Sequence, residues 1–328
     1  MRLTTKQLIW QRTALTIIAA LALPSAKLSA QQETLRWPSS YKPRSAAKII
    51  TVSKGGEGEP FIYRTRNFEL RSHSAVTPRN LQLFANIMES VPTVIGKLPL
   101  PLLGMPNGER AKVFIYPDEE TFTQAGGAAG AGGYYDGRKQ AIMLRADAFL
   151  KPPSRPGSRL TAPPNYDLLV HEFTHLCMHQ DLAYLPVWFT EGTAEYMAAA
   201  HQSGGSYQFS NITQHISRHI KKNLPNDKGI IVLPSVVSTM AHTHESWRNQ
   251  IAKGSVEDHY RSYATALLIT HTLFHGGSKR LSATRSFVAN IHQSRGRKAN
   301  PQPETEKLIP AKERDALEKR IVAYWKTR

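Results

Sequence analysis

The stretch HEFTH, residues 171–175, decides how this chain folds, and LPVWFTEGTAEY, residues 185–196, follows it closely. Residues four positions apart lie on one face of a helix, so His171 and His175 can reach a single metal ion. Glu172 lies one residue further along and reaches the side of that ion where water binds. The pattern therefore predicts a zinc site with Glu172 as general base.

The second stretch supplies the remaining ligand. A catalytic zinc ion usually takes three protein ligands and leaves one position to water. Glu191 comes sixteen residues after His175 and begins a helical face that it shares with Glu195. Two neutral imidazoles and one carboxylate leave the site with a net positive charge, which lowers the pKa of bound water so that Glu172 can take its proton. Glu195, one turn on, suits an outer role in which it accepts the far N–H of a ligand histidine.

Three further HxxxH pairs serve as an internal comparison. None has an acidic residue in second position or a suitable third ligand after it, so we interpret their histidines as ordinary helical or surface residues. His242-Thr-His244 is interpreted in the same way as part of a polar loop. The three pairs are His175/His179, His215/His219 and His271/His275.

Together, the two stretches resemble the gluzincin metallopeptidases, the superfamily of thermolysin and aminopeptidase N. The similarity is greatest to bacterial proteins that combine HExxH with W-x-x-E-G-x-A-E-Y, and it is specific only over residues 166–197. The resemblance implies one Zn²⁺ per chain, held by the three ligands named above, with the same general base and outer partner. It also implies that the strand pair ending at residues 141–144 corresponds to the edge strand on which such enzymes lay a substrate backbone.

Such enzymes also need a donor for the oxyanion that forms when hydroxide attacks the peptide carbonyl. In the aminopeptidase N branch this donor is a tyrosine at the start of a later helix, and residues 259–264 begin a comparable helix. We therefore expect Tyr260 to be the donor, with Tyr263 in reserve and His242 or His244 as further alternatives. The Gly-Ala-Met-Glu-Asn motif by which that branch holds a substrate amino terminus is absent, so an endopeptidase is expected.

Strands are expected early in the chain and helices late, which predicts an α+β fold. In detail we expect a zincin-like catalytic fold, with an N-terminal α+β lobe, a C-terminal helical lobe and zinc in the cleft between them. The Gly-rich residues 126–133 lack the Gly-Lys-Ser/Thr of a phosphate-binding loop and are interpreted as an ordinary loop. Residues 151–164 hold five prolines and are expected to be irregular.

Single elements follow from hydrophobic periodicity and from capping residues. Residues 61–71 alternate in the manner of one strand, and Thr77-Pro78 is typical of a helix start. Further strands are expected at residues 112–116, 134–137 and 140–144. Further helices are expected at residues 118–125, from Asn165 onward, and at 187–200, 210–222, 258–274, 283–294 and 310–326.

Residues 1–30 are typical of a secretory signal, with a basic start, an apolar run at residues 14–23 and a small-residue cleavage site that ends at Ala30. The apolar run is too short to span a bilayer comfortably. We therefore expect an exported protein, periplasmic or secreted. Residues 31–60 are polar, basic and rich in Pro and Gly, as expected of a linker or arm, and residues 61–328 are expected to form the metallopeptidase domain.

The chain is strongly basic, with a formal net charge of +17, or +13 without residues 1–30. Besides a peptide or protein substrate, an anionic cell-wall or membrane surface is an expected partner in an exported protein, and nucleic acid is not. Cys177 is the only cysteine, so no intramolecular disulfide can form. We interpret it as a small buried residue, because thiol catalysis needs an accessible thiolate.

Two other classes of function stay open at this point. The chain could be a zinc-binding envelope scaffold or binding protein without turnover, although a glutamate at position 172 argues against that because a non-catalytic site needs no base there. It could also be a basic wall-binding or membrane-binding protein in which zinc is incidental. Zinc stoichiometry separates this last class from the others, and chelator-sensitive proteolysis separates an enzyme from a scaffold.

Overall fold

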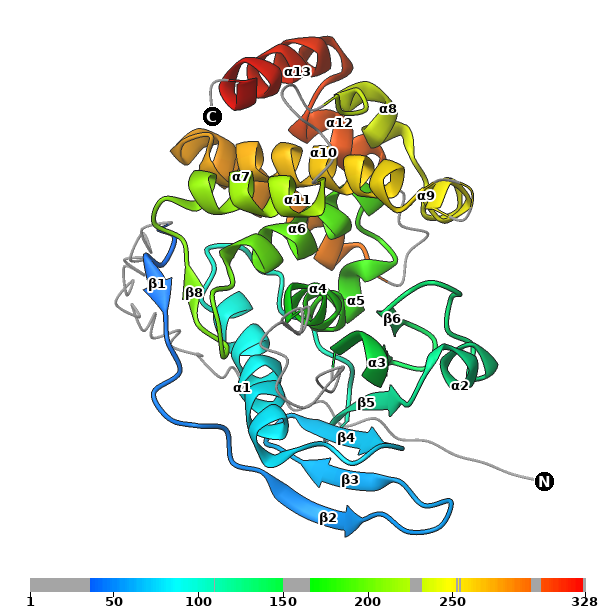
Figure 1. Ribbon diagram of the computed structural model, residues 1–328. Coiled ribbons are helices and arrows are strands. Elements are labelled where there is room, and N and C mark those ends of the chain that lie inside the picture. Colours follow the sequence, from blue (N-terminus) through cyan, green and yellow to red (C-terminus); the bar gives the residue numbers. More distant parts are fainter. Residues whose placement is uncertain are drawn as a thin grey trace, which may run out of the picture. The chain divides into compact units, whose positions relative to one another are not determined.

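A six-stranded mixed sheet forms one side of the protein (Figure 1). The computed structural model describes residues 36–108, 110–149, 166–224, 232–251, 253, 255–295 and 302–326. Strands β2, β3 and β4 are antiparallel neighbours, β4, β5 and β7 run parallel, and β6 returns antiparallel to β7. In spatial order the strands are β2 (Ile50–Lys54), β3 (Phe61–Arg64), β4 (Phe68–Ser72), β5 (Ala111–Tyr116), β7 (Ala141–Arg145) and β6 (Gly133–Asp136).

The inner face of this sheet packs on helices α1 (Pro78–Ile95) and α4 (Tyr166–Cys177). Side chains alternate between the two faces of a strand, so Phe68 and Leu70 of β4 reach the core while Glu69 turns to the other side. Phe68 meets Phe173 of α4 edge-on, with ring centroids 5.2 Å apart. The sheet thereby supports the helix that carries HEFTH.

Local signals position α1 as the sequence predicts. The side chain of Thr77 accepts a hydrogen bond from the backbone N–H of Asn80, and Pro78 occupies the first turn, where no N–H is needed. A similar cap begins the short helix α2 (Glu119–Gln124), where Asp118 accepts from the N–H of Thr121. These expected helix starts are confirmed.

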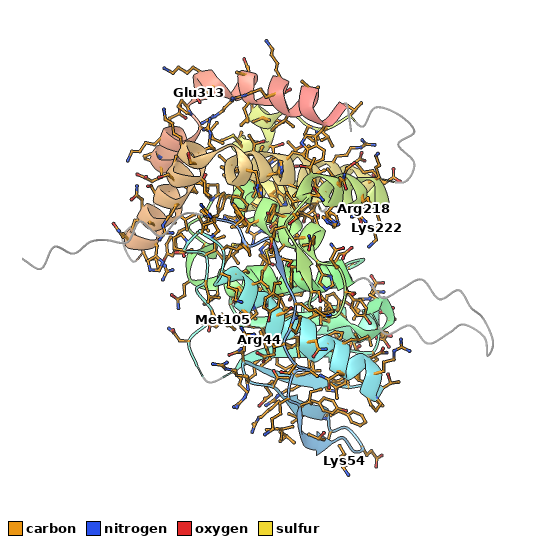
Figure 2. The ribbon with its side chains drawn as sticks, turned by 90° about the vertical axis from the view of Figure 1, so that its left-hand side faces the viewer. Arg44, Lys54, Met105, Arg218, Lys222 and Glu313 are labelled. Atoms are coloured by element: carbon orange, nitrogen blue, oxygen red, sulfur yellow. The ribbon has the colours of Figure 1, made fainter. Side chains whose placement is uncertain are left out.

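Most of the later helices lie on the side of α4 away from the sheet, whereas the short helix α3 (Ala146–Phe149) contacts β7 (Figures 1 and 2). Helix α6 (Val187–Ala200) lies against α4, and α10 (Val256–His275) and α7 (Ile212–Asn223) lie against α6. The others are α3 (Ala146–Phe149), α5 (His179–Leu182), α8 (Val236–Ala241), α9 (His244–Ile251), α11 (Ser278–Gln293), α12 (Gln302–Leu308) and α13 (Ala311–Lys326). The mixed architecture, with strands first and helices after, agrees with the expected α+β class in general.

Helix α6 is apolar on all sides and is the most deeply packed helix of the site region. All of its residues are buried except Glu191, which is partly accessible. A helix that is hydrophobic all round belongs in a core. This explains why residues 187–200 were predicted with the bounds that the structure has.

The expectation of one strand over residues 61–71 is wrong, because a turn at residues 65–67 divides the segment into β3 and β4. Glu89 of α1 fixes this turn by accepting hydrogen bonds from the hydroxyl of Thr65, 2.6 Å, and the backbone N–H of Asn67, 2.8 Å. The strand-like alternation of residues 61–71 continues through the turn, but the carboxylate of Glu89, which is distant in sequence, ends the strand there.

The structure also differs from a linker over the described part of residues 31–60. Strand β2 pairs with β3 across the expected domain boundary at residue 61. A second small sheet joins β1 (Ser40–Tyr41) to β8 (Tyr207–Gln208), and Trp37 donates a hydrogen bond to the carbonyl of Phe274. This segment is therefore attached both to the sheet and to the helices.

The sheet has two edge strands, β2 and β6, and β7 lies inside it between β5 and β6. Of the expected pair, β6 is therefore an edge strand, whereas the strand at residues 141–144 is interior. Its side chains are buried on both faces, as is usual for an interior strand.

Three expectations concern segments that lie outside the described residues. These are the secretory signal with its cleavage site at Ala30, the irregular connection at residues 151–164 and the helix cap at Asn165. None of the helices in the described part of the chain is long and apolar enough to cross a membrane.

Substitution of Gly192 tests how closely α6 and α10 must approach each other. A Cβ at this position would fall far inside van der Waals contact with the backbone carbonyl of Ala266 and the hydroxyl of Thr270. Gly192→Ala should therefore lower the free energy of unfolding by about 1–3 kcal/mol, as overpacking does, measured by urea denaturation. Gly56→Ala is the control, because its nearest neighbour would be Glu59 Cβ at 4.0 Å. Equal urea midpoints for the two variants would contradict this view of the α6–α10 contact.

Candidate metal centre

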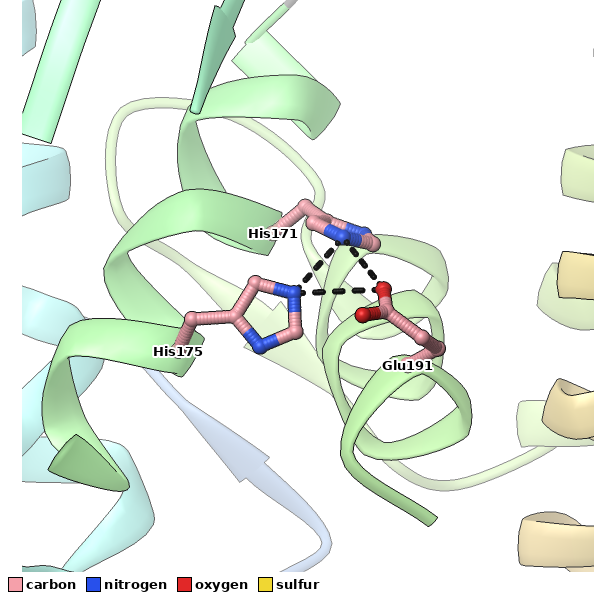
Figure 3. A group of neighbouring side chains, drawn as sticks. All are labelled: His171, His175 and Glu191. Atoms are coloured by element: carbon pink, nitrogen blue, oxygen red, sulfur yellow. Dashed lines mark hydrogen bonds and ion pairs between the residues drawn. The ribbon is translucent and has the colours of Figure 1, made fainter. Parts of the chain in front are cut away.

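Three side chains from two adjacent helices converge on one point (Figure 3). The Nε2 atoms of His171 and His175, both on α4, lie 3.0 Å apart. Oε2 of Glu191, on α6, lies 3.2 Å from each of these nitrogens. We call these three residues the ligand cluster, and its geometry can hold a metal ion.

The spacing of the ligand cluster fits a small ion. Ligand atoms at ~2.0–2.1 Å from a tetrahedral zinc ion are separated from one another by about 3.3 Å, close to the three distances observed. A deprotonated imidazole nitrogen and a carboxylate oxygen offer only lone pairs when they face each other. Three such acceptors packed together in a buried place repel one another unless a proton or a metal cation joins them.

The local fold explains why the two histidines point the same way. They are four residues apart on α4, whose first turn is at Tyr166 and whose other faces meet the sheet, α1 and α6. Both imidazoles are buried. Both Nε2 atoms lie close to Glu191 of α6, the one residue of that helix that is not fully buried.

Glu191 is held in its charged form. Burial raises the pKa of a carboxyl group, but His175 and His171 more than offset this effect and lower the pKa of Glu191 to about 2. At neutral pH the group therefore offers a carboxylate oxygen, the form that binds a cation.

Glu172 lies beside edge strand β6. Its Oε2 accepts a hydrogen bond from the backbone N–H of Tyr135, with an N–O distance of 2.7 Å. Burial raises the pKa of Glu172, an effect that Glu191 reinforces and that His171 and His175 oppose. A carboxylate with a raised pKa beside the ligand cluster is suited to accept a proton.

Glu195 takes the outer position that the sequence suggested. Its Oε1 lies 2.8 Å from Nδ1 of His171. Burial alone would raise the pKa of Glu195, but hydrogen bonds from His171 and His219 hold it well below its ordinary value. Because an ionised carboxylate can only accept, Nδ1 of His171 carries the hydrogen and Nε2 keeps its lone pair for a metal.

The two sequence stretches that predict the site do not include His219 of α7. Its Nε2 lies 2.7 Å from Oε2 of Glu195, and the residue is buried. His219 is helical, as interpreted, and lies outside the ligand cluster, but its buried contact with Glu195 was not predicted. Helical spacing was the available signal, because His219 follows the buried Ile212 and Ile216 by seven and three residues on the same helix.

The other histidines have separate partners. His179 bonds the hydroxyl of Tyr135, His215 contacts Gln202 and Arg218, and His275 bonds the hydroxyl of Tyr196. His271 is buried and stacks on His275. His242 bonds Ser246, whereas His244 begins α9 and bonds the carbonyl of Leu185, so the expected polar loop is helical from His244 onward.

The two candidate tyrosines lie in different places. Tyr263 meets the ligand His171 edge-on, with ring centroids 5.9 Å apart, and its ring also contacts Trp247. Tyr260 packs instead on His219, with centroids 6.0 Å apart, and Glu195 adds to burial in raising its pKa. The reserve tyrosine therefore contacts the ligand cluster, and the first choice contacts the groups behind it.

A separate cavity of about 370 Å³ opens elsewhere on the molecule, with Arg64, Glu69 and Lys112 in its wall. Glu69 and Lys112 are register partners on the sheet face that turns away from α4. The cavity shares no lining residue with the ligand cluster.

No protein-family model matches the chain, and no curated protein matches it in sequence.

Glu191 generates the test of the ligand cluster. Glu191→Ala removes one ligand and one negative charge, so its metal affinity should fall by more than the ~10–100-fold that loss of an outer partner costs. Metal content after dialysis and competition with a chromophoric chelator measure this. Asp315→Ala, an exposed carboxylate on α13, makes the same charge change and should bind metal as the parent does. Undiminished affinity in Glu191→Ala would remove this residue from the cluster.

Proposed function

We propose that this chain is a zinc-dependent metallopeptidase of the gluzincin type, with a zincin-like catalytic fold. The observation that carries the proposal is the convergence of His171, His175 and Glu191 at 3.0–3.2 Å with the carboxylate of Glu172 beside them. Three ligands from two packed helices leave a fourth position free, which distinguishes a catalytic zinc site from a closed structural one.

Zinc is the proposed metal because of the donor set. Two imidazoles and one carboxylate match a common ligand set of catalytic zinc, whereas Mg²⁺ and Ca²⁺ prefer oxygen ligands alone. The short separations favour a small tetrahedral ion. A zinc ion bound there would supply a Lewis acid that polarises water and the scissile carbonyl.

Glu172 is proposed as the group that moves the proton. The Tyr135 N–H holds its Oε2, which fixes the carboxylate and leaves Oε1 to face the reacting water. Glu172 takes a proton from that water during attack and gives it to the leaving amide nitrogen afterwards. Its burial supports this cycle, because a raised pKa brings the acid and base forms closer in energy near neutral pH.

Tyr263 is proposed as the oxyanion donor in place of Tyr260. Burial and the negative charge of Glu191 raise the pKa of Tyr263, so its hydroxyl keeps its hydrogen at neutral pH and can donate it. Its contact with His171 places it at the ligand cluster. A donor fixed in a buried site stabilises the developing charge without reorganisation.

Strand β6 supports a peptide as the substrate. As an edge strand it can accept an extended chain by main-chain pairing, and its Tyr135 is the residue that bonds Glu172. A peptide laid along β6 would bring its backbone to the proposed base. The absence of the Gly-Ala-Met-Glu-Asn motif, which would hold a substrate amino terminus, favours an endopeptidase. Export of the protein and binding of its basic surface to an anionic cell wall or membrane remain part of the proposal.

Glu172→Gln tests the general base and separates an enzyme from a zinc-binding scaffold. The amide keeps the shape of the side chain but cannot take a proton, so cleavage of a denatured protein substrate should fall by ~10²–10⁴-fold while zinc content stays at the parent's level. The parent's cleavage should be lost with a chelator and return with zinc. A variant that cleaves as fast as the parent would refute the assignment, and a zinc-loaded parent without any cleavage would favour the scaffold.

Tyr263→Phe tests the oxyanion donor. The ring is kept, so zinc content and stability should hold, while kcat and kcat/KM fall together by ~10²–10³-fold and KM stays nearly constant. Tyr260→Phe is the matched control three residues earlier on α10. A large loss in the control alone would return the role to Tyr260, and no loss in either would exclude both tyrosines.

A further inference from the structure

A chain of buried polar groups runs from the ligand cluster to the surface at α7. Glu195 joins His171 to His219, with 2.8 Å to Nδ1 of the first and 2.7 Å to Nε2 of the second. Beyond His219 lies Asp167, whose carboxylate is 3.9 Å from Nδ1 of His219. We call Glu195, His219 and Asp167 the outer network.

The direction of its hydrogen bonds follows from the charge of Glu195. Both carboxylate oxygens accept a hydrogen bond, one from each histidine. The carboxylate group therefore cannot turn about its Cγ–Cδ bond without breaking both hydrogen bonds. This double support matters because Nδ1 of the second ligand, His175, has no hydrogen-bond partner among the described residues. In that part of the chain, His171 is the ligand whose ring is oriented by an outer carboxylate.

Asp167 fixes the far side of the network. It lies in the first turn of α4, four residues before His171, and bonds Nζ of Lys222 at 2.6 Å. Nδ1 of His201, at the end of α6, is 3.8 Å from the same carboxylate. Lys222 lies at the surface beside Arg218 on α7 (Figure 2), with 59% of its side chain exposed. The contacts of the Asp167 carboxylate thereby connect helices α4, α6 and α7 behind the ligand cluster.

Tyr260 closes this network from α10. Its ring packs edge-on against His219, and Asn223 of α7 donates to the carbonyl of His219 one turn away. Hydrogen bonds between charged groups gain strength where water is excluded. Tyr260 therefore packs on the outer network through its ring and not on the ligand cluster.

We propose that His219 is a positioning residue of the metal centre: it holds the Glu195 carboxylate, and through Glu195 it fixes the ring and tautomer of the ligand His171, which raises metal affinity. The inference rests on the proposed metal site. It extends that site to α7, a helix outside both sequence stretches that predict the metal.

Metal affinity of three variants tests the proposal. His219→Leu removes the donor, and the zinc dissociation constant, measured by chelator competition, should rise ~10–100-fold as for other outer partners. His219→Gln places an amide N–H near the former Nε2 and should recover most of that loss. His215→Leu, one turn earlier on α7, is the matched control and should leave the constant unchanged, because its partners are Gln202 and Arg218.

Two further measurements separate positioning from a merely structural role. The visible absorption of the Co²⁺-substituted protein should change in His219→Leu and return in His219→Gln, because it reports ligand geometry. In a Glu195→Gln background, His219→Leu should cost no further affinity, since the carboxylate through which it acts is gone. Thermal unfolding of the metal-free proteins checks folding, and if His219→Leu fails to fold, the shorter amide of His219→Asn replaces it.

The outcomes distinguish this inference from the proposed function. If the parent binds no metal, the proposed metal site itself fails. If the parent binds metal, three results would each overturn the positioning role while the metal site stands. The first is equal metal affinity in His219→Leu and the parent, and the second is no recovery of affinity in His219→Gln. The third is that the losses of metal affinity in the Glu195→Gln and His219→Leu variants add in the double variant.

Discussion

Glu195 carries a negative charge into α6, a helix that is otherwise apolar on nearly every side, and the arrangement of the site depends on how that charge is held. Its two oxygens accept from His171 and His219, which belong to the helices on either side. A buried carboxylate without partners would cost several kcal/mol. The pairing therefore fixes the rotation of α4 and α7 about α6, and with it the direction in which HEFTH faces.

Once α4 is fixed in this way, the other groups of the site follow from packing. Glu172 is turned toward the sheet, where β6 supplies a backbone N–H, while the two ligand histidines face Glu191. The close approach of α6 and α10 at Gly192 brings the ring of Tyr263 to His171. The proposed base, ligands and hydroxyl donor thus come from three helices that a single core holds together, and edge strand β6 supplies the backbone N–H that holds the base.

Sequence patterns anticipated the parts of this arrangement that depend on local physics. Helix α6 was predicted with its observed bounds because Pro186 marks its start, and the start of α1 was predicted because Thr77 and Pro78 form a cap. Helical spacing alone places residues 171 and 175 together, whereas Glu191 was expected from the second sequence stretch. The break between β3 and β4 was not, because a glutamate from α1 fixes the turn. The role of His219 was missed for the same reason: its partner lies on another helix.

Because Glu195 is buried in α6 and Glu191 is mostly covered there, a lineage of such chains cannot lose its histidines one at a time without a loss of stability. Loss of His171 leaves both carboxylates short of a partner, and a buried polar group without a hydrogen bond costs about 1–3 kcal/mol, and more when it is charged, against the ~5–15 kcal/mol that keeps a domain folded. Drift away from metal binding would have to exchange histidines and glutamates in concert. Descendants should therefore retain the whole set or replace it with apolar residues, and mixed sets should be rare.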